Sequence, residues 1–256
     1  VDDKIEEFIL ETNDLTYDRD QDRFFTKGIT EAFIESKYQF VSSDVFLNRK
    51  TKQLKSDNFS TIKDDNNNHY KLSKFLYFYE KKFLKGNNIE VETVSENKEK
   101  DKFYFENAFI NLSDNSFNSK DTKINIHKTI FDKEREINEE NKNVFLGKND
   151  PRIYGNSSFG NKDIVVLNKA IFTSCAKNDS CPAWSIKADK ITHDKINKNI
   201  SYNNAILNIY DIPVFYFPKF FHPDPSVKRQ SGFLKPEINN SNVLGSSLSQ
   251  PYFKAI

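Results

Sequence analysis

Residues 210–236 read YDIPVFYFPKFFHPDPSVKRQSGFLKP and divide the chain into two parts. The run from Ile212 to Phe221 is rich in aromatic and aliphatic residues, which favour β-strands. Proline cannot donate a backbone N–H to a sheet, so prolines in such a run predict a boundary and not the middle of a strand. One β-region is therefore predicted to end here and another to begin near Gly232. The interrupting prolines are Pro213, Pro218, Pro223 and Pro225.

Upstream of this stretch, short runs of alternating apolar and polar residues recur, separated by polar turns. Successive side chains of a strand point to opposite faces, so each run has one apolar and one polar face. The predicted fold class is all-β. The apolar faces can either pack against each other in a dry core or line an open slot, and the alternation fits both. The predicted lining residues are Phe103, Phe105, Ile110, Ile124, Ile126, Val165, Leu167, Trp184, Ile186, Leu207 and Ile209.

A repeated pattern indicates that the strands are stacked in layers. Residues 15–19 (LTYDR), 45–49 (VFLNR) and 77–81 (YFYEK) each place an apolar strand end before a polar residue and a base. Their spacing of about thirty residues suits a repeated pair of strands per layer. Such layers bury their apolar faces only by stacking.

Composition excludes several classes of protein. The chain has 256 residues and a formal net charge of +1, which argues against a protein held to nucleic acid by bulk charge. It has no run of eighteen apolar residues, and its start at Val1 lacks a signal-peptide pattern. We expect a fragment of a longer protein that stops at Ile256.

Candidate catalytic residues are not grouped in the sequence. The four histidines lie apart, and no nucleophile motif, phosphate-binding glycine loop or metal-ligand spacing occurs. The prediction is a protein without enzymatic activity, cofactor or metal. A β-helical enzyme or adhesin acting on polysaccharide remains an alternative, and it requires carboxylates that converge on one solvent face.

The order of several short motifs resembles the LptD family of lipopolysaccharide-assembly proteins. The downstream motifs are I-P-V-x-Y-x-P, H-P-D-P, K-R-x-S-G-F-L-x-P and P-Y-F, the last at 251–253. The upstream motifs are FTSC at 172–175, PAWSIKA at 182–188 and ITHD at 191–194. The resemblance covers residues 171–253 and places them at the join between the periplasmic domain of that family and its outer-membrane barrel.

The resemblance implies a slot-like β-jellyroll of the OstA and LptA type over residues 1–220. Residues 221–256 would form a connector and the first hairpin of a transmembrane β-barrel. Lipopolysaccharide would cross the periplasm with its acyl chains in the slot and pass to the outer leaflet of a Gram-negative outer membrane. Pro213, Pro218, Pro223, Pro225 and Gly232 would form the hinge that sets the angle between slot and barrel.

Two partners are implied by the same resemblance, an LptA-like periplasmic bridge protein and an LptE-like lipoprotein plug. Fold analogy and chain direction predict that the bridge protein docks by strand addition at the N-terminal strands, near Ile9, Leu15 and Tyr17. A soluble bridge protein of the LptA or LptC type is the alternative. It would explain the stacked strands but leaves the S-G-F-L and P-Y-F segments without a role.

Cys175 and Cys181 enclose a five-residue loop rich in turn formers. In a periplasmic protein such a pair predicts a disulfide, ahead of a free thiol or a metal site. In the family, the cysteine that matches Cys175 can also bridge to the distant end of the barrel, so the partner of Cys175 stays open. Trp184, directly after this loop, is predicted to pack in the core.

Overall fold

The computed structural model describes residues 2–3, 8–35, 37–94, 100–126, 151–175, 182–225, 227, 232–233, 237–241, 245–249 and 252–254. These residues form strands and turns, which confirms the all-β prediction. Within these ranges no helix is long and apolar enough to cross a bilayer.

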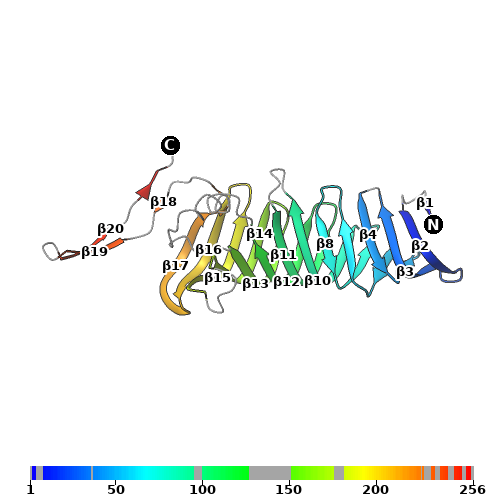
Figure 1. Cartoon of the computed structure of the whole chain (residues 1–256), viewed down its shortest axis with the longest axis horizontal. Helices are drawn as coiled ribbons and strands as arrows, with labels where there is room; N and C mark the ends of the chain where they lie inside the picture. The colour runs from blue at the N-terminus through cyan, green and yellow to red at the C-terminus, as the bar shows by residue number, and fades with distance from the viewer. Residues whose placement is uncertain are drawn as a thin grey trace, which may run out of the picture.

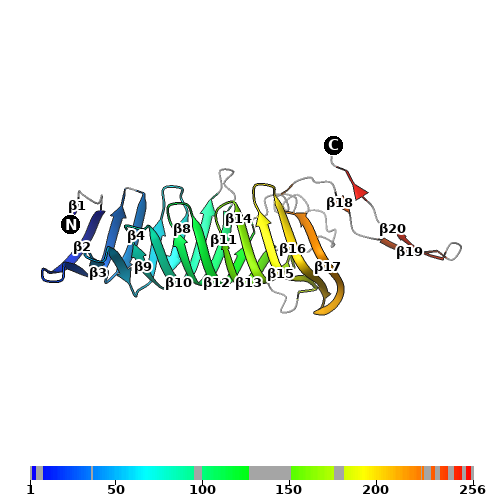
Figure 2. The same ribbon diagram turned by 180° about the vertical axis from the view of Figure 1, so that it is seen from behind.

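Seventeen of the strands belong to one sheet, in which the paired strands are antiparallel. Its N-terminal part contains β1 (Asp2–Asp3), β2 (Phe8–Asp18), β3 (Arg23–Ile34), β4 (Tyr38–Ser43), β5 (Phe46–Asn48), β6 (Gln53–Ser56), β7 (Ser60–Lys63), β8 (His69–Leu72) and β9 (Lys74–Phe78). The long strands that follow are β10 (Phe83–Val94), β11 (Lys100–Asn111), β12 (Ser116–Asn125), β13 (Arg152–Gly160), β14 (Ile164–Thr173), β15 (Trp184–Asp194), β16 (Asn199–Ile209) and β17 (Ile212–Pro223). The strands stack into an elongated body with β2 near one end and β17 at the other (Figures 1 and 2).

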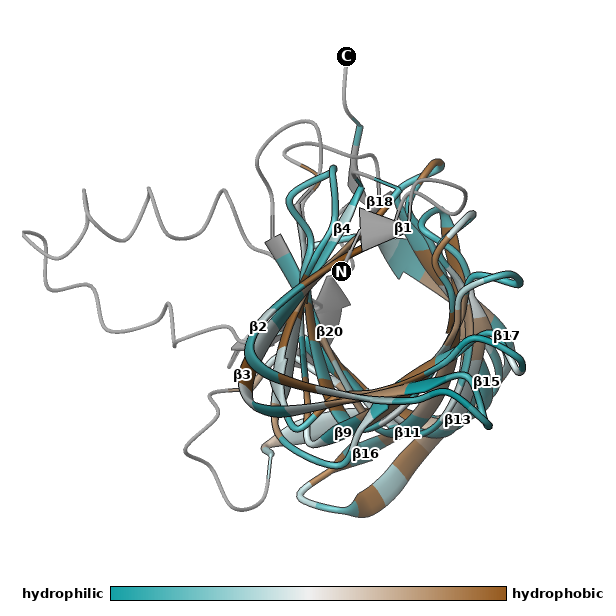
Figure 3. Ribbon diagram, turned by 90° about the vertical axis from the view of Figure 1, so that its right-hand side faces the viewer, coloured by the Kyte–Doolittle hydropathy of each residue, from teal (hydrophilic) through white to brown (hydrophobic). Residues whose placement is uncertain are grey.

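The long strands bend at one common level, where the register of each pair skips one residue on both strands. At this level Asn88, Asp121, Lys169 and Asn204 have positive φ, which interrupts the extended backbone. A series of such interruptions at one level folds the whole sheet over. Viewed along its long axis, the sheet curves around an interior (Figure 3). The exposed corner residues are Asn88, Glu106, Asp121, Asn156, Lys169, Asp189, Asn204 and Pro218.

Small residues on the inner side of this corner allow the sheet to fold tightly. Thr122, Gly155, Ala170, Ala188 and Ala205 are register partners in a continuous row from β12 to β16. A Cβ atom on Gly155 would lie 3.0 Å from the Cβ atom of Leu167, closer than ordinary van der Waals contact. Larger side chains in this row would push the two halves of the sheet apart.

The strand ends form two rims along the folded sheet. The first rim carries four-residue turns at 19–22, 49–52, 79–82, 112–115 and 195–198, and the first three of them begin thirty residues apart, at 19, 49 and 79. The last residue of each has a positive φ, as at Asp22 (51°) and Lys82 (55°). The second rim carries the turn residues Glu35 and Lys37 and the turns at 64–68 and 210–211. The repeated strand pairs predicted from the sequence are therefore present.

The large sheet ends with β17 and the next described strand begins at Gly232, as predicted, but the prediction that the prolines do not lie in the middle of a strand was wrong. Strand β17 runs through Pro213 and Pro218 and ends at Pro223. Proline is tolerated at the edge of a sheet, and the register partners of β17 lie on β16. Pro218 falls at the corner, where it has no partner in the register. Pro225 lies in the turn that follows.

Beyond β17, four short strands pair in a nested arrangement. In the outer pair, Gly232 and Phe233 of β18 (Gly232–Phe233) lie opposite Phe253 and Tyr252 of β21 (Tyr252–Phe253). The inner pair is β19 (Glu237–Ser241) with β20 (Gly245–Ser249). The G-F residues of the first motif and the Y-F residues of the second thus face each other across one pair of strands. The division of the chain at residue 220 stays a prediction, since β17 itself ends at Pro223.

Candidate functional site: apolar interior and rims

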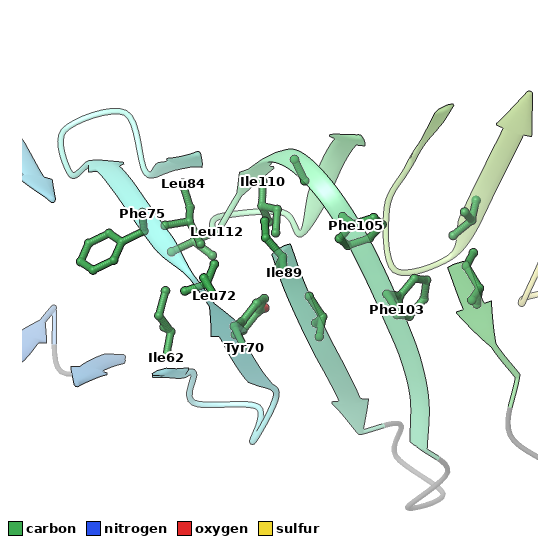
Figure 4. Packing of buried hydrophobic residues seen from close by; sticks show 14 of the residues in the cluster. Ile62, Tyr70, Leu72, Phe75, Leu84, Ile89, Phe103, Phe105, Ile110 and Leu112 are labelled. Atoms are coloured by element: carbon green, nitrogen blue, oxygen red, sulfur yellow. The ribbon is translucent and has the colours of Figure 1, made fainter. Parts of the chain in front are cut away.

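The folded sheet encloses one continuous cluster of buried apolar side chains (Figure 4). Among the predicted lining residues, Trp184 and Leu207 pack against the margin of this cluster. Ile209 lies outside it and is 45% exposed. The buried members are Phe103, Phe105, Ile110, Ile124, Ile126, Val165, Leu167 and Ile186.

Ile209 is the last residue of β16, and its register partner is Trp184, with no shift between β15 and β16. It therefore lies on the same face as Leu207 and Trp184, but at the end of the strand, outside the buried cluster. Alternation predicts the face of a residue and not the point at which the core ends. A role of the interior in lipid binding stays a prediction.

The two walls of the fold touch along its length. Phe40 near the second rim lies 5.2 Å from Tyr77 near the first, measured between ring centroids. Phe105 and Phe117 make a similar contact at 5.2 Å, and Phe172 lies 4.9 Å from His222. Protein side chains therefore fill the described interior in this structure.

Three contacts join the rims, and together we name them the rim clasp. Lys82 Nζ lies 2.8 Å from Glu35 Oε2, and Lys195 Nζ lies 2.6 Å from Asp101 Oδ2. Between them, the hydroxyl of Tyr38 donates a hydrogen bond to the carbonyl of Leu112. The partners are 47 to 94 residues apart in sequence. Sequence reasoning missed the clasp, because no local pattern relates turns on opposite rims.

Burial supports the hydrogen bond at the centre of the clasp. Loss of solvation, together with the nearby carboxylates of Asp65, Asp64 and Glu35, raises the pKa of Tyr38 to about 12. The hydroxyl is therefore protonated at neutral pH and remains a donor to Leu112.

At the C-terminal end of the interior, two histidines form a buried polar cluster with their partners. His193 Nε2 contacts Asp224 Oδ2, and both side chains are buried. Tyr202 donates its hydroxyl hydrogen to His222 Nε2 at 2.7 Å, and His222 Nδ1 lies 2.7 Å from the carbonyl oxygen of Pro223. The H-P-D-P segment is therefore attached to β15 and β16.

This cluster was not predicted, since the two histidines are far apart in sequence. The sheet brings them together because Ile200 is the register partner of both His193 and His222. Within the described ranges, no group of three or more His, Cys, Asp or Glu residues could hold a metal ion. The cluster is thus an anchor for the chain after β17.

Burial lowers the pKa of His222 below its ordinary value, so the unfolded chain binds a proton more readily than the folded one. Stability from neutral His222 is present above the unfolded-state pKa and is lost as pH falls through the folded-state pKa. We expect the urea midpoint to fall between about pH 7.5 and about pH 5 by more in the wild type than in His222→Gln, whose side chain does not titrate. Parallel pH profiles would contradict this assignment.

The predicted docking edge lies on β2. The pairings of β2 comprise β3 along its length and β1 at Phe8 and Ile9. Ile9 and Tyr17 are exposed, whereas Leu15 packs against the core. The Tyr17 hydroxyl donates to Asp22 Oδ1 at 3.1 Å, and its ring stacks on Phe24. Docking at this edge stays a prediction.

The cysteine prediction falls partly outside the described residues, because Cys181 lies in the undescribed range 176–181. Cys175 is partly exposed, and its Sγ lies 3.6 Å from the carbonyl oxygen of Trp184. Its backbone N–H donates to Thr173 Oγ1 at 3.2 Å. The pairing of Cys175 stays open.

Known proteins give the chain relatives over part of its length, although no family model matches it. It is 39% identical over 95 residues to "LPS-assembly protein LptD" of Legionella pneumophila strain Paris, which covers 37% of this chain and 11% of that protein. A relative with the same name from Ectopseudomonas mendocina is 36% identical over 90 residues, which are 35% of this chain and 9% of that protein. Another from Polaromonas sp. is 34% identical over 92 residues, which are 35% of this chain and 11% of that protein. The chain spans about a tenth of the length of these curated relatives. The resemblance to the LptD family that the motifs indicate is therefore confirmed over 35–37% of the chain.

Proposed function

We propose that this chain contains the periplasmic β-jellyroll of a lipopolysaccharide-assembly protein of the Gram-negative outer membrane. Residues 1–220 would carry the acyl chains, and residues 221–256 would form the connector and first barrel hairpin. The observation that supports this most is the continuous apolar interior along the whole stack, in a chain similar to LptD. The protein moves lipid and catalyses no reaction.

Acyl chains can enter only if the two walls part, because side chains fill the interior. The ion pairs of the rim clasp are partly solvated, and pairs of this kind contribute roughly 0.2–1 kcal/mol each. Each methylene transferred from water to an apolar site contributes about 0.8 kcal/mol. A few buried methylenes therefore outweigh the clasp, and the sugar and phosphate head remains in water between the separated rims.

The two ends of the sheet suit different neighbours. β2 contains no proline, so an LptA-like bridge protein can add a strand there and continue the interior. β17 contains three prolines, which makes it a poor template for strand addition. Lipid would thus enter at the β2 end and leave at the β17 end, toward a barrel with an LptE-like plug.

A photo-crosslinker in place of Phe105 tests the lipid site. In the purified chain incubated with lipopolysaccharide, we expect a lipid adduct at this buried position. Phe109 on the same strand is the matched control, since its side chain is exposed. Equal capture at both positions, or capture at Phe109 alone, would refute an interior lipid site.

A photo-crosslinker in place of Tyr17 tests the docking edge. We expect an adduct with the bridge protein at Tyr17 and none at Tyr216, which lies on β17 at the other end. An adduct at Tyr216 alone would reverse the direction of transfer and leave the lipid site unaffected.

An exposed carboxylate pair favours a second candidate, an enzyme acting on polysaccharide. A side-chain hydrogen bond with Asp121 raises the pKa of Glu106. Both residues lie on the exposed corner of the folded sheet, whereas glycoside hydrolysis requires two carboxylates facing each other across a cleft. Hydrolysis of a polysaccharide that Glu106→Gln abolishes would establish this candidate.

A further inference from the structure

The β16–β17 hairpin ends in exposed apolar side chains that the proposed function does not use. Their exposed fractions range from 42% to 66%, although all six are large apolar or aromatic residues. In Figure 1 this end of the hairpin curls below the rest of the stack. The hairpin tip consists of Ile209, Tyr210, Ile212, Val214, Phe215 and Tyr216.

The hairpin is apolar on both faces. Phe215 is the register partner of Leu207, which packs against the core, so Phe215 lies on the inner face. Tyr216 is the partner of Ile206 and lies on the outer face. Apolar burial is non-directional, so lipid that surrounds an inserted tip removes both faces from water, whereas a folded protein packed on one face covers that face alone. An end that is apolar all round therefore suits a lipid surface.

The backbone and the charge of the hairpin tip also favour a lipid surface over a protein partner. The three prolines of β17 disfavour a partner strand, so binding relies on side chains. Asp211 is the only charged residue between 209 and 216, and Lys187 lies 3.4 Å from its carboxylate. Tyr210 and Tyr216 are of the residue type enriched where a membrane meets water. Lys187 of β15 offsets the single negative charge of the segment, so the two side chains together carry no net charge that would oppose an anionic lipid surface.

We propose that the hairpin tip inserts into the interfacial region of a phospholipid bilayer and anchors the β17 end of the sheet there. The contact needs no lipopolysaccharide and lies outside the apolar interior. It rests on the proposed function only for the location of the sheet beside a membrane.

Trp184 is an intrinsic probe of this contact. It is the only tryptophan of the chain and the register partner of Ile209, which itself pairs with Ile212. Vesicles of brominated phosphatidylcholine and phosphatidylglycerol quench a tryptophan that lies near their acyl chains. We expect such vesicles to quench Trp184 in the wild-type chain, even if the segment after β17 also binds them.

A matched pair of double variants assigns the effect to the tip. Ile212→Asn with Phe215→Ser is expected to reduce vesicle partitioning, measured by quenching, at least about tenfold, since two large apolar groups leave the lipid. Ile29→Asn with Phe59→Ser is the control, because these side chains are 74% and 64% exposed and lie in the N-terminal half. The control is expected to bind as the wild type does.

Three outcomes would overturn the proposal. They are vesicle binding without quenching of Trp184, equal loss in both double variants, and a tip-dependent dimer in solution that does not bind vesicles. Lipid capture at Phe105, measured without vesicles, is expected to be the same in the tip variant and the wild type. If the wild-type tip does not bind vesicles while Phe105 still captures lipid, the anchor alone is refuted, whereas absence of capture at Phe105 in the wild type would refute the proposed function.

Discussion

Replacing Asp224 with alanine is expected to destabilise the folded sheet by about 1–3 kcal/mol, because it leaves a buried polar group of His193 without its hydrogen-bond partner. The imidazole of His193 is buried, and its Nδ1 already has no hydrogen-bond partner among the described residues. Loss of Asp224 would leave Nε2 without its carboxylate as well. The change in the free energy of unfolding can be measured by urea denaturation at neutral pH.

Two further variants separate the buried pair from ordinary surface charge. Asp224→Asn keeps the size of the side chain and removes its charge, so it is expected to lower the free energy of unfolding by less than Asp224→Ala does. Lys71→Gln breaks an exposed pair with Glu90 at 3.7 Å and is expected to cost less than about 1 kcal/mol. If Asp224→Ala lowers the free energy of unfolding by less than Lys71→Gln does, the buried pair contributes nothing to stability.

The same pair bears on the route of the chain. Asp224 follows β17 directly, and its backbone N–H donates to the carbonyl of Lys198 at 2.9 Å. Its side chain is held by β15 and its backbone by the turn before β16. A hinge between the jellyroll and the following strands would therefore lie beyond Asp224. Of the five predicted hinge residues, only Pro225 and Gly232 lie there.

Much of the fold could be predicted from periodicity. Alternation correctly identified the inward side chains from Phe103 to Ile186, because a residue that packs in a folded sheet must recur at every second position. The thirty-residue spacing correctly indicated layers. Both signals are local, and each strand carries them independently of its neighbours.

The features that the sequence did not predict all depend on which strands become neighbours. The prolines of β17 correctly indicated a boundary, but a strand that runs through Pro213 and Pro218 was not predicted, because the position of β17 beside β16 at the end of the stack was unknown. The His193–Asp224 pair and the rim clasp join turns and strands far apart in sequence, and only the folding of the sheet brings them together. Ile209 lies on the predicted face but outside the core, because β16 ends there and neighbouring strands do not cover it. Contacts of this kind follow from topology and register, which composition and spacing do not specify.

Locking the rim clasp is expected to abolish lipid capture in the interior. A carbodiimide joins an amine and a carboxylate by an amide bond without a spacer, with loss of water, so it couples groups already in contact. Lys82 with Glu35 and Lys195 with Asp101 meet this condition at 2.8 and 2.6 Å. Mass spectrometry should find both cross-linked peptides, and the treated chain should give no lipid adduct with a photo-crosslinker at Phe105.

The control for this experiment is the double variant Lys82→Arg with Lys195→Arg. Arginine retains the positive charge and both ion pairs, but its guanidinium does not form the amide under these conditions. The variant also undergoes every other carbodiimide modification of the surface, so it isolates the effect of the two cross-links. We expect it to capture lipid after treatment as well as before. If the cross-linked wild type still captures lipid at Phe105, the acyl chains enter from an end of the stack and the rims need not part. Equal loss in the wild type and the arginine variant would mean that modified surface carboxylates, and not closed rims, prevent binding.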